Sequence, residues 1–293
     1  MQVLFALLKP FIYIVAISPF WLIYVYSNLA YLVFYKLFRY RLRVVRKNLG
    51  MVFPTYMIPE LKEIERKYYK HLFDLLFEGI KLTRISEKEL LKRCDFKNPE
   101  LLNQIYDSGK HAVIVMGHTG NWEWASGVVN LKTKHQLQSL YQPIKVQAFE
   151  NFVLNTRKRF GTQLIERKKA LRTIIQQKDS EVLYATNFLA DQSPYQMEKA
   201  EWLNFFGLET PFFNGYAAIA KKIKSPIVFL QIKMVKRGYY SIETELLTDT
   251  PENLDHTEIV KRFANKLEHE LLRQPHNWLW THKRWKRAHL KPN

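Results

Sequence analysis

The chain has 293 residues, 47% of them hydrophobic, which is enough for one large domain or two small ones with a full core. Lys and Arg outnumber Asp and Glu by 45 to 27, and the net charge of +18 predicts a polyanionic partner: nucleic acid, anionic lipid or an acidic protein. A single cysteine, Cys94, excludes a disulfide framework and a CxxC zinc or redox site, and we interpret it as a small buried apolar residue.

The first element expected along the chain is an apolar helix near the N-terminus. Residues 10–35 contain no charged side chain, and a continuous helix of that length would extend about 39 Å, against a hydrocarbon thickness of roughly 30 Å. The segment lacks the basic start and the cleavage site of a secretory signal peptide. We expect a membrane anchor over residues 1–40, which either spans the bilayer or, because Pro19 interrupts it, lies in the interface. A buried core helix is the alternative.

A cluster of basic residues follows the apolar segment. Six Lys and Arg side chains lie between residues 36 and 47. If the segment spans the membrane, these charges would keep the rest of the chain in the cytoplasm by the positive-inside rule. Basic residues beside a membrane segment also attract anionic headgroups. The sequence therefore predicts an anionic membrane surface as a partner.

The remainder of the chain predicts an α/β domain. An amphipathic helix is expected over 59–83, and Ser86 with Glu89 forms a capping box that opens another helix. From residue 111 strands alternate with helices, which predicts a central mixed, largely parallel sheet flanked by helices. No linker divides residues 41–293, so we expect one domain there. The strands are expected near 111–116, 136–141, 181–189, 227–234 and 239–247, and the helices near 121–131, 145–160, 168–178, 214–223 and 255–273.

An ionisable pair follows the buried strand at 111–116, in the segment HAVIVMGHTGNWEWASG. Ligands of open α/β sheets bind at the carboxyl ends of strands. His118 lies two residues past such an end and Glu123 falls in the first turn of the next helix, so both can face one crevice. A histidine held by a carboxylate is a positioned general base. The alternatives are a glutamate that complements the helix dipole and a solvated loop histidine, and spacing alone does not separate them.

Several motifs together resemble one family. GHTGNWE at 117–123 resembles the H-x-x-x-x-[D/E] signature of the glycerolipid acyltransferases. More narrowly, the chain resembles the late lipid A acyltransferases, a branch that includes lauroyl and myristoyl transferases and phosphatidylinositol mannoside acyltransferases. The resemblance covers nearly the whole chain. The motifs that carry it, in order, are RKNLGMVFP at 46–54, LYQPIK at 140–145, TRKRFG at 156–161, ADQSP at 190–194, NFFG at 204–207 and WLWTHKRWK at 278–286.

The resemblance implies an O-acyltransferase domain over residues 41–293. His118 would take the proton of an acceptor hydroxyl, the alkoxide would attack an acyl thioester, and Glu123 would hold the imidazole. The tetrahedral oxyanion needs donors, for which Arg157 and the backbone N–H groups near Gly120 are candidates. Two further candidates, which end a strand and could face a ligand, are Asp191 and Gln192. A carboxylate that caps its own turn is the alternative for Asp191.

The expected partners follow from the same resemblance. They are acyl carrier protein as donor, with a coenzyme A thioester possible, a lipid A precursor as acceptor, and the cytoplasmic side of the cell inner membrane. No HExxH, Walker A, GxGxxG or GxSxG motif is present, so no metal or other cofactor is expected. A lysophospholipid or aminolipid acceptor remains an alternative. From another class, a basic membrane-associated nucleic-acid-binding protein would explain the charge, but no basic–aromatic array that stacks bases is evident, so no nucleic acid is expected.

Overall fold

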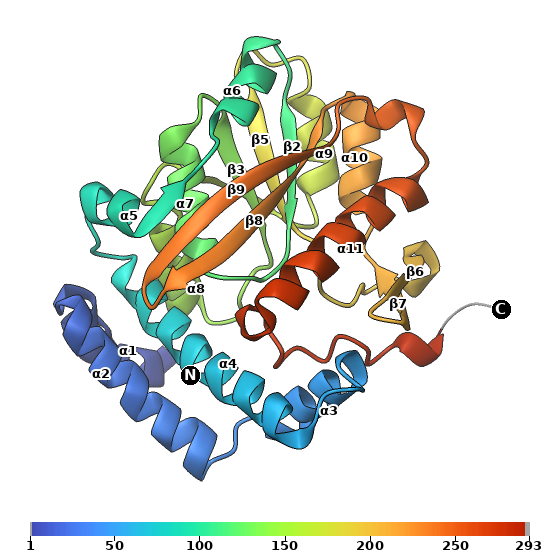
Figure 1. Cartoon of the computed structure of the whole chain (residues 1–293). Coiled ribbons are helices and arrows are strands. Elements are labelled where there is room, and N and C mark those ends of the chain that lie inside the picture. The colour runs from blue at the N-terminus through green and yellow to red at the C-terminus, as the bar shows by residue number, and fades with distance from the viewer. Residues whose placement is uncertain (1, 291–293) are drawn as a thin grey trace.

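A seven-stranded sheet forms the centre of the molecule (Figure 1). The computed structural model of the chain describes residues 2–290, with the side chains of residues 7–288 and 290. The strand order is β1-β9-β8-β2-β5-β3-β4, and the pairs are parallel except β8 with β9. These strands are β1 Cys94–Phe96, β2 Ala112–Met116, β3 Gln136–Tyr141, β4 Gln163–Glu166, β5 Tyr184–Leu189, β8 Ile227–Lys236 and β9 Tyr239–Thr248. The expectation of a mixed, largely parallel sheet flanked by helices is confirmed.

Helices and a small hairpin surround the sheet. The hairpin consists of β6 Glu201–Phe205 and β7 Leu208–Phe212. The α-helices after the N-terminal region are α3 Leu42–Val52, α4 Ile58–Lys81, α5 Glu87–Arg93, α6 Glu100–Asp107, α7 Trp122–Lys132, α8 Gln147–Lys158, α9 Ala170–Gln176, α10 Gly215–Ile223 and α11 His256–Arg273. Short 3-10 helices lie at Met197–Lys199, Pro251–Asn253, Pro275–Asn277 and Ala288–Leu290.

The central strand β2 sends its side chains into two separate hydrophobic clusters. Val113 and Val115 pack in the cluster that includes α10 and α11, while Ile114 and Met116 pack in the cluster that includes α7. Successive residues of a strand point to opposite faces, and a strand buried on both faces is therefore apolar throughout. This accounts for the uninterrupted apolar run of β2 and places its carboxyl end between two packed layers.

The expectation of an N-terminal membrane helix was wrong. The apolar segment forms three pieces: α1 Gln2–Ile17, α2 Phe20–Ala30 and a π-helix at Tyr31–Leu37. The break falls at Pro19, which lacks a backbone N–H and whose ring clashes with the preceding turn of a continuing helix. Across the part of the chain that the structure describes, none of the helices combines the length and the apolar character needed to cross a bilayer. The division of the chain at residue 40 remains a prediction.

The buried carboxylate of Glu78 joins the N-terminal helices to the sheet. This α4 side chain is fully buried and accepts hydrogen bonds from Tyr24 of α2 at 3.0 Å, Asn121 at 2.8 Å and Tyr240 of β9 at 2.7 Å. Burial, followed by the charge of Asp74, raises the pKa of Glu78 to about 7. A buried charge needs such donors, since an unpaired one is costly. One carboxylate thus fixes three elements against α4.

The titration of Glu78 should make stability depend on pH. Because its pKa is raised from 4.5 to about 7 in the folded protein, its contribution is complete below the lower value and is lost as the pH rises through the higher one. We expect the free energy of unfolding to fall by on the order of 3 kcal/mol more in the wild type than in Glu78→Gln between those two pH values. Urea denaturation at a series of pH values measures this difference. Parallel pH profiles for the two proteins would contradict it.

Candidate active site

His118 lies in a tightly held turn between β2 and α7. Gly120 has a φ of +52°, and a Cβ there would lie 2.4 Å from Ile232 Cγ2, so only glycine fits. The Gly120 N–H donates to the carbonyl of Asn277 at 3.1 Å. Asn121 caps α7 by accepting from the Trp124 N–H at 3.0 Å. The turn is therefore fixed directly after His118, and the Gly120 N–H already has a partner.

The carboxylate partner of His118 is Asp191. His118 Nδ1 lies 2.6 Å from Asp191 Oδ1, while the His118 N–H and Trp278 Nε1 donate to Asp191 Oδ2 at 3.0 and 2.7 Å. Asp191 is only 2% exposed. Burial alone would raise its pKa, but the charge and hydrogen bonds of His118 outweigh burial, and the pKa of Asp191 falls well below its usual range. The pair is thus an ionised carboxylate against an imidazole ring.

This contact determines which ring nitrogen of His118 can act as a base. An ionised carboxylate only accepts hydrogen bonds, so the proton of a neutral imidazole resides on Nδ1 and Nε2 carries the lone pair. Gln192 Nε2 lies 3.3 Å from His118 Nε2 and donates to it. The His118 side chain is 15% exposed, and its ring meets the edge of Trp122 at 5.2 Å. The geometry is that of a positioned general base.

Glu123 is paired with Arg157, whereas the sequence interpretation has it holding the imidazole. Arg157 Nε donates to Glu123 Oε2 at 2.9 Å, and Arg157 Nη2 donates to Oε1 at 2.5 Å. Burial lowers the pKa of Arg157, but the charge and hydrogen bonds of Glu123 outweigh burial and raise it. A bidentate arginine–carboxylate pair fixes the guanidinium plane. The expected site residues therefore form two groups. Glu123 contacts Arg157, and His118 contacts Asp191 and Gln192.

A small polar cavity of about 60 Å³ adjoins the Glu123–Arg157 pair. Trp122, whose ring lies 5.2 Å from that of His118, also lines this cavity. Asn187 and Ser126 lie at its wall, with Asn187 Nδ2 3.5 Å from Ser126 Oγ. The cavity sits where β3, β5, α7 and α8 meet. It is therefore next to the expected oxyanion donor Arg157.

Sequence reasoning missed the C-terminal contribution to the site. Trp278 is buried and donates to Asp191, and Asn277 accepts from the Gly120 N–H. His282 Nε2 accepts from the Ser193 N–H at 3.2 Å, and burial lowers the pKa of His282 to about 4. The signal was present in the ADQSP and WLWTHKRWK motifs, which contain Asp191, Ser193, Trp278 and His282, while Asn277 directly precedes the second motif. Among the described side chains, no group of three His, Cys, Asp or Glu residues could hold a metal ion.

The fold is an α/β sheet that holds a histidine–aspartate pair at the carboxyl end of its central strand. The model of the family described as bacterial lipid A biosynthesis acyltransferase matches residues 3–287, and the chain belongs to this family. A lipid A biosynthesis acyltransferase of Haemophilus influenzae is 22% identical over 239 residues, 80% of this chain and 72% of the relative. A lipid A biosynthesis palmitoleoyltransferase of Escherichia coli is 22% identical over 245 residues, 83% of this chain and 78% of the relative. The family resemblance of the sequence motifs is confirmed.

The turn at Gly120 supplies a stability prediction. Gly120→Ala adds a Cβ at positive φ and drives it into Ile232, so we expect a loss of about 2–4 kcal/mol in the free energy of unfolding. Gly109→Ala is a matched control, because Gly109 also has a positive φ, +74°, but nothing lies within 4 Å of the added Cβ. Chemical denaturation should show a loss of about 1 kcal/mol in the free energy of unfolding for the control. Equal losses would show that the contact with Ile232 does not constrain the turn.

Proposed function

We propose that the protein transfers a fatty acyl chain from acyl carrier protein to a hydroxyl of a lipid A precursor, with His118 as general base. The contact that carries the proposal is the one between His118 Nδ1 and the buried Asp191 carboxylate, at the carboxyl end of the central strand. The family supports the reaction class. The names of the relatives, both assigned to lipid A biosynthesis, support the acceptor.

The proposed reaction needs no covalent enzyme intermediate. His118 Nε2 removes the proton of the acceptor hydroxyl, and the oxygen attacks the thioester carbonyl carbon. The tetrahedral oxyanion then collapses, the carbon–sulfur bond breaks, and the thiolate takes the proton from Nε2. Asp191 stabilises the imidazolium that forms between these steps, because its charge lies 2.6 Å from Nδ1. Each cycle therefore returns the ring to the neutral form that Asp191 orients.

Arg157 is the proposed donor to the oxyanion. Its Nε and Nη2 atoms donate to Glu123, which leaves Nη1 for a ligand. A preorganised donor aimed at developing charge contributes more than one that must reorient. Glu123 then acts by fixing the guanidinium rather than by holding the imidazole. Because the Gly120 N–H donates to Asn277, we do not assign that group to the oxyanion.

The charge of the chain supports the proposed donor and acceptor. A net charge of +18 suits an acidic acyl carrier protein and a phosphorylated glycolipid. A coenzyme A thioester and a lysophospholipid or aminolipid acceptor are the alternatives to be tested. Family membership favours the enzyme over a nucleic-acid-binding protein.

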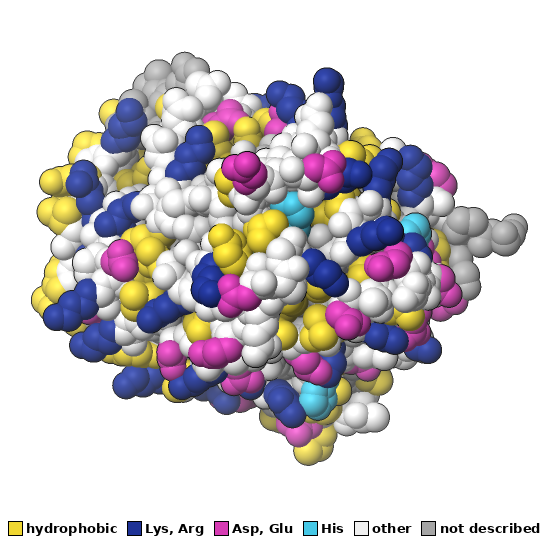
Figure 2. Space-filling view, turned by 90° about the horizontal axis from the view of Figure 1, so that it is seen from above, with side chains coloured by type: hydrophobic (Ala, Val, Ile, Leu, Met, Phe, Trp, Pro, Cys, Tyr) yellow, Lys and Arg dark blue, Asp and Glu magenta, His cyan; other side chains and the backbone are white. Residues whose placement is uncertain are grey.

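We also propose that the N-terminal helices lie on an anionic membrane surface at the cytoplasmic side of the inner membrane. The supporting feature is a set of large apolar side chains that α1, α2 and the π-helix leave exposed: Leu7, Trp21, Leu37 and Phe38 are 66% to 72% exposed. Large apolar side chains exposed in number on one region of the chain are typical of interaction sites. On the face that Figure 2 shows, charged side chains of both signs are interspersed. The apolar surface and the lipid substrate thus both favour a bilayer.

The membrane proposal predicts a selective loss of vesicle binding. The double variant Leu37→Glu/Phe38→Glu replaces two exposed apolar side chains with charged ones that do not enter the membrane interface. We expect it to bind vesicles that contain anionic phospholipid at least about tenfold more weakly than the wild type does. Leu171→Glu/Leu246→Glu is the matched control, since both leucines are also exposed but lie on α9 and β9. Cosedimentation measures both. Equal losses in the two double variants would contradict this orientation.

The catalytic proposal predicts a large effect from the orienting carboxylate. Asp191→Asn removes the charge that stabilises the imidazolium, and we expect kcat to fall by roughly 10²–10⁴-fold. His118→Ala should abolish transfer, and Asp179→Asn, at a side chain that is 85% exposed, should leave it unchanged. The measurement is the mass gain of one acyl chain on a lipid A precursor, with lysophospholipid and aminolipid acceptors and both thioester donors in parallel.

Normal turnover in Asp191→Asn, with the fold intact by circular dichroism, would contradict the proposed role of the pair. Preferential acylation of another acceptor would leave the His118 chemistry in place and overturn the lipid A assignment.

A further inference from the structure

A second, larger cavity lies between α1 and α8. Its volume is about 510 Å³, within the range of small-molecule sites. Ala148, Asn151, Phe152, Asn155 and Arg159 line it from α8 and the residue after it, and their spacing of three and four residues places them on one helix face. None of the residues that line this cavity lines the smaller one beside Glu123. The two cavities are therefore separate, with α8 between them.

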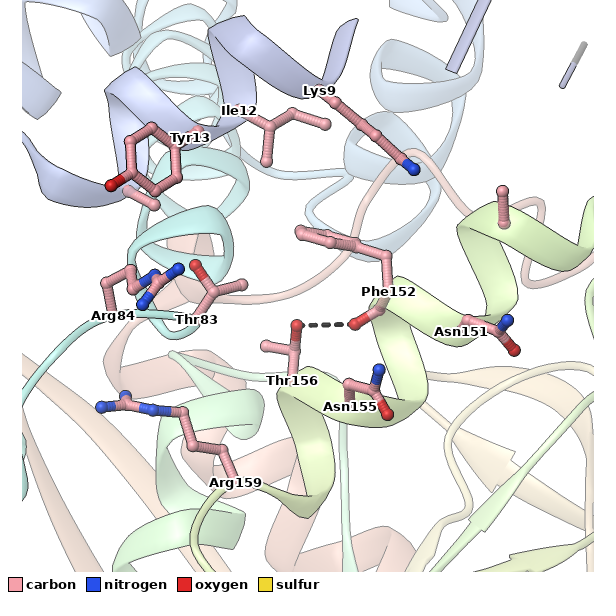
Figure 3. A pocket seen from close by; sticks show the side chains of 12 residues that line it. Lys9, Ile12, Tyr13, Thr83, Arg84, Asn151, Phe152, Asn155, Thr156 and Arg159 are labelled. Carbon is pink, nitrogen blue, oxygen red and sulfur yellow. Dashed lines mark hydrogen bonds between the residues drawn. The ribbon is translucent and has the colours of Figure 1, made fainter. Parts of the chain in front are cut away.

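On the side formed by α1, the larger cavity is lined by Lys9 at one end and otherwise by apolar and aromatic side chains. Ile12, Tyr13 and Ala16 line it from α1, and Phe152 lies between them and the rest of α8 (Figure 3). Exposed apolar side chains of the same helix continue beyond it, Phe11 at 46% and Ile14 at 51%. An acyl chain bound here would thus contact apolar side chains within the cavity and further exposed apolar side chains of α1 outside it.

Two arginine side chains, Arg84 and Arg159, line the larger cavity. Figure 3 shows Arg84 and Arg159 on the same side of the cavity and Lys9 at its other end. Arg159 Nη1 donates to the carbonyl of Leu82 at 2.8 Å, and Arg84 lies 5.4 Å from the centre of the Tyr13 ring. Burial and then the charge of Arg84 lower the pKa of Arg159.

No carboxylate lines this cavity, and within the described residues none forms an ion pair with Arg84 or Arg159. Neighbouring guanidinium groups without a counter-charge favour an anion, and their planar, forked donors match phosphate.

We propose that this cavity binds one anionic glycerophospholipid, with its phosphate between Arg84 and Arg159 and an acyl chain along Ile12 and Phe152. The charge of the wall selects the phosphate, and the apolar residues of α1 select the chain. Because the cavity shares no lining residue with the Glu123–Arg157 cavity, this lipid is a ligand additional to the acyl acceptor. The proposal therefore does not depend on the acyl-transfer reaction.

Binding of this lipid should be visible in the dynamics of α8. The helix has no buried side chain of its own, and a lipid that fills the space between α1 and α8 adds packing to its inner face. Slower amide hydrogen exchange follows when opening of a helix becomes less favourable. Exchange over residues 147–158 thus reports occupancy of the cavity independently of any enzyme assay.

The experiment uses the full chain with three short-chain probes. They are dioctanoyl phosphatidylglycerol, dioctanoylglycerol, which lacks the phosphate, and inorganic phosphate. Native mass spectrometry gives the stoichiometry and affinity, and hydrogen exchange gives the location. We expect one phosphatidylglycerol to bind per chain and to slow exchange over residues 147–158. Dioctanoylglycerol and inorganic phosphate should each bind at least about tenfold more weakly than phosphatidylglycerol.

Three variants test the assignment of the site. Arg84→Gln/Arg159→Gln should weaken phosphatidylglycerol binding about tenfold or more, and Asn155→Trp should block the cavity while it keeps both arginines. Arg172→Gln/Lys222→Gln removes the same charge from exposed positions on α9 and α10 and should bind like the wild type. Wild-type binding in both cavity variants would overturn the proposal. So would equal binding of dioctanoylglycerol, or equal slowing of exchange by inorganic phosphate alone, which would identify a site for an apolar chain or for free phosphate.

Discussion

The buried carboxylate of Asp191 connects parts of the chain that are far apart in sequence. It accepts hydrogen bonds from the His118 backbone and ring and from the Trp278 indole. A buried carboxylate without donors would be strongly destabilising, so the turn after β2 and the C-terminal segment must both be in place for Asp191 to remain ionised. The same charge sets the tautomer of His118. The C-terminal segment and the His118 ring are therefore held by the same carboxylate.

A second buried carboxylate, that of Glu78, also connects distant segments of the chain to the turn that contains His118. Glu78 accepts from Asn121, which caps α7, and also from Tyr24 of α2. The Asn121 cap comes three residues after His118, so the position of the base depends on α4 and, through Tyr24, on the N-terminal helices. The N-terminal region thus contacts the same hydrogen-bond network that holds the turn containing His118.

Strand order explains what the sequence could and could not predict. The alternation of strand and helix patterns in the sequence was enough to locate β2 and β5, and His118 was singled out by its place after β2. The carboxylate that contacts His118 was not identified correctly, because Glu123 is close to His118 in sequence whereas Asp191 is close to it in space. β2 and β5 are parallel neighbours in which Met116 pairs with Leu189, so the residues two positions further on are His118 and Asp191. Neighbouring strands therefore bring those two side chains together.

The N-terminal segment shows a different limit. Its composition correctly indicated a strongly apolar region, and Pro19 correctly indicated an interruption. Hydropathy does not show, however, whether each helix of this segment forms hydrogen bonds with polar side chains elsewhere in the chain. Ser27 donates to Asp74 of α4, and Arg237 also binds Asp74, so α2 is held by side chains whose positions depend on the folded sheet. Such contacts between distant segments leave no periodic signal in the sequence.

The geometry of α8 relates the two cavities to each other. Arg157 and Arg159 are two residues apart, and at 3.6 residues per turn their side chains leave an α-helix on nearly opposite sides. One donates to Glu123 beside the smaller cavity, and the other lines the larger cavity against α1. Because α8 has no buried side chain, its position is determined chiefly by the contacts at these two faces. Any ligand that packs between α1 and α8 thus acts on the same rigid element that presents the Arg157 guanidinium to the proposed oxyanion.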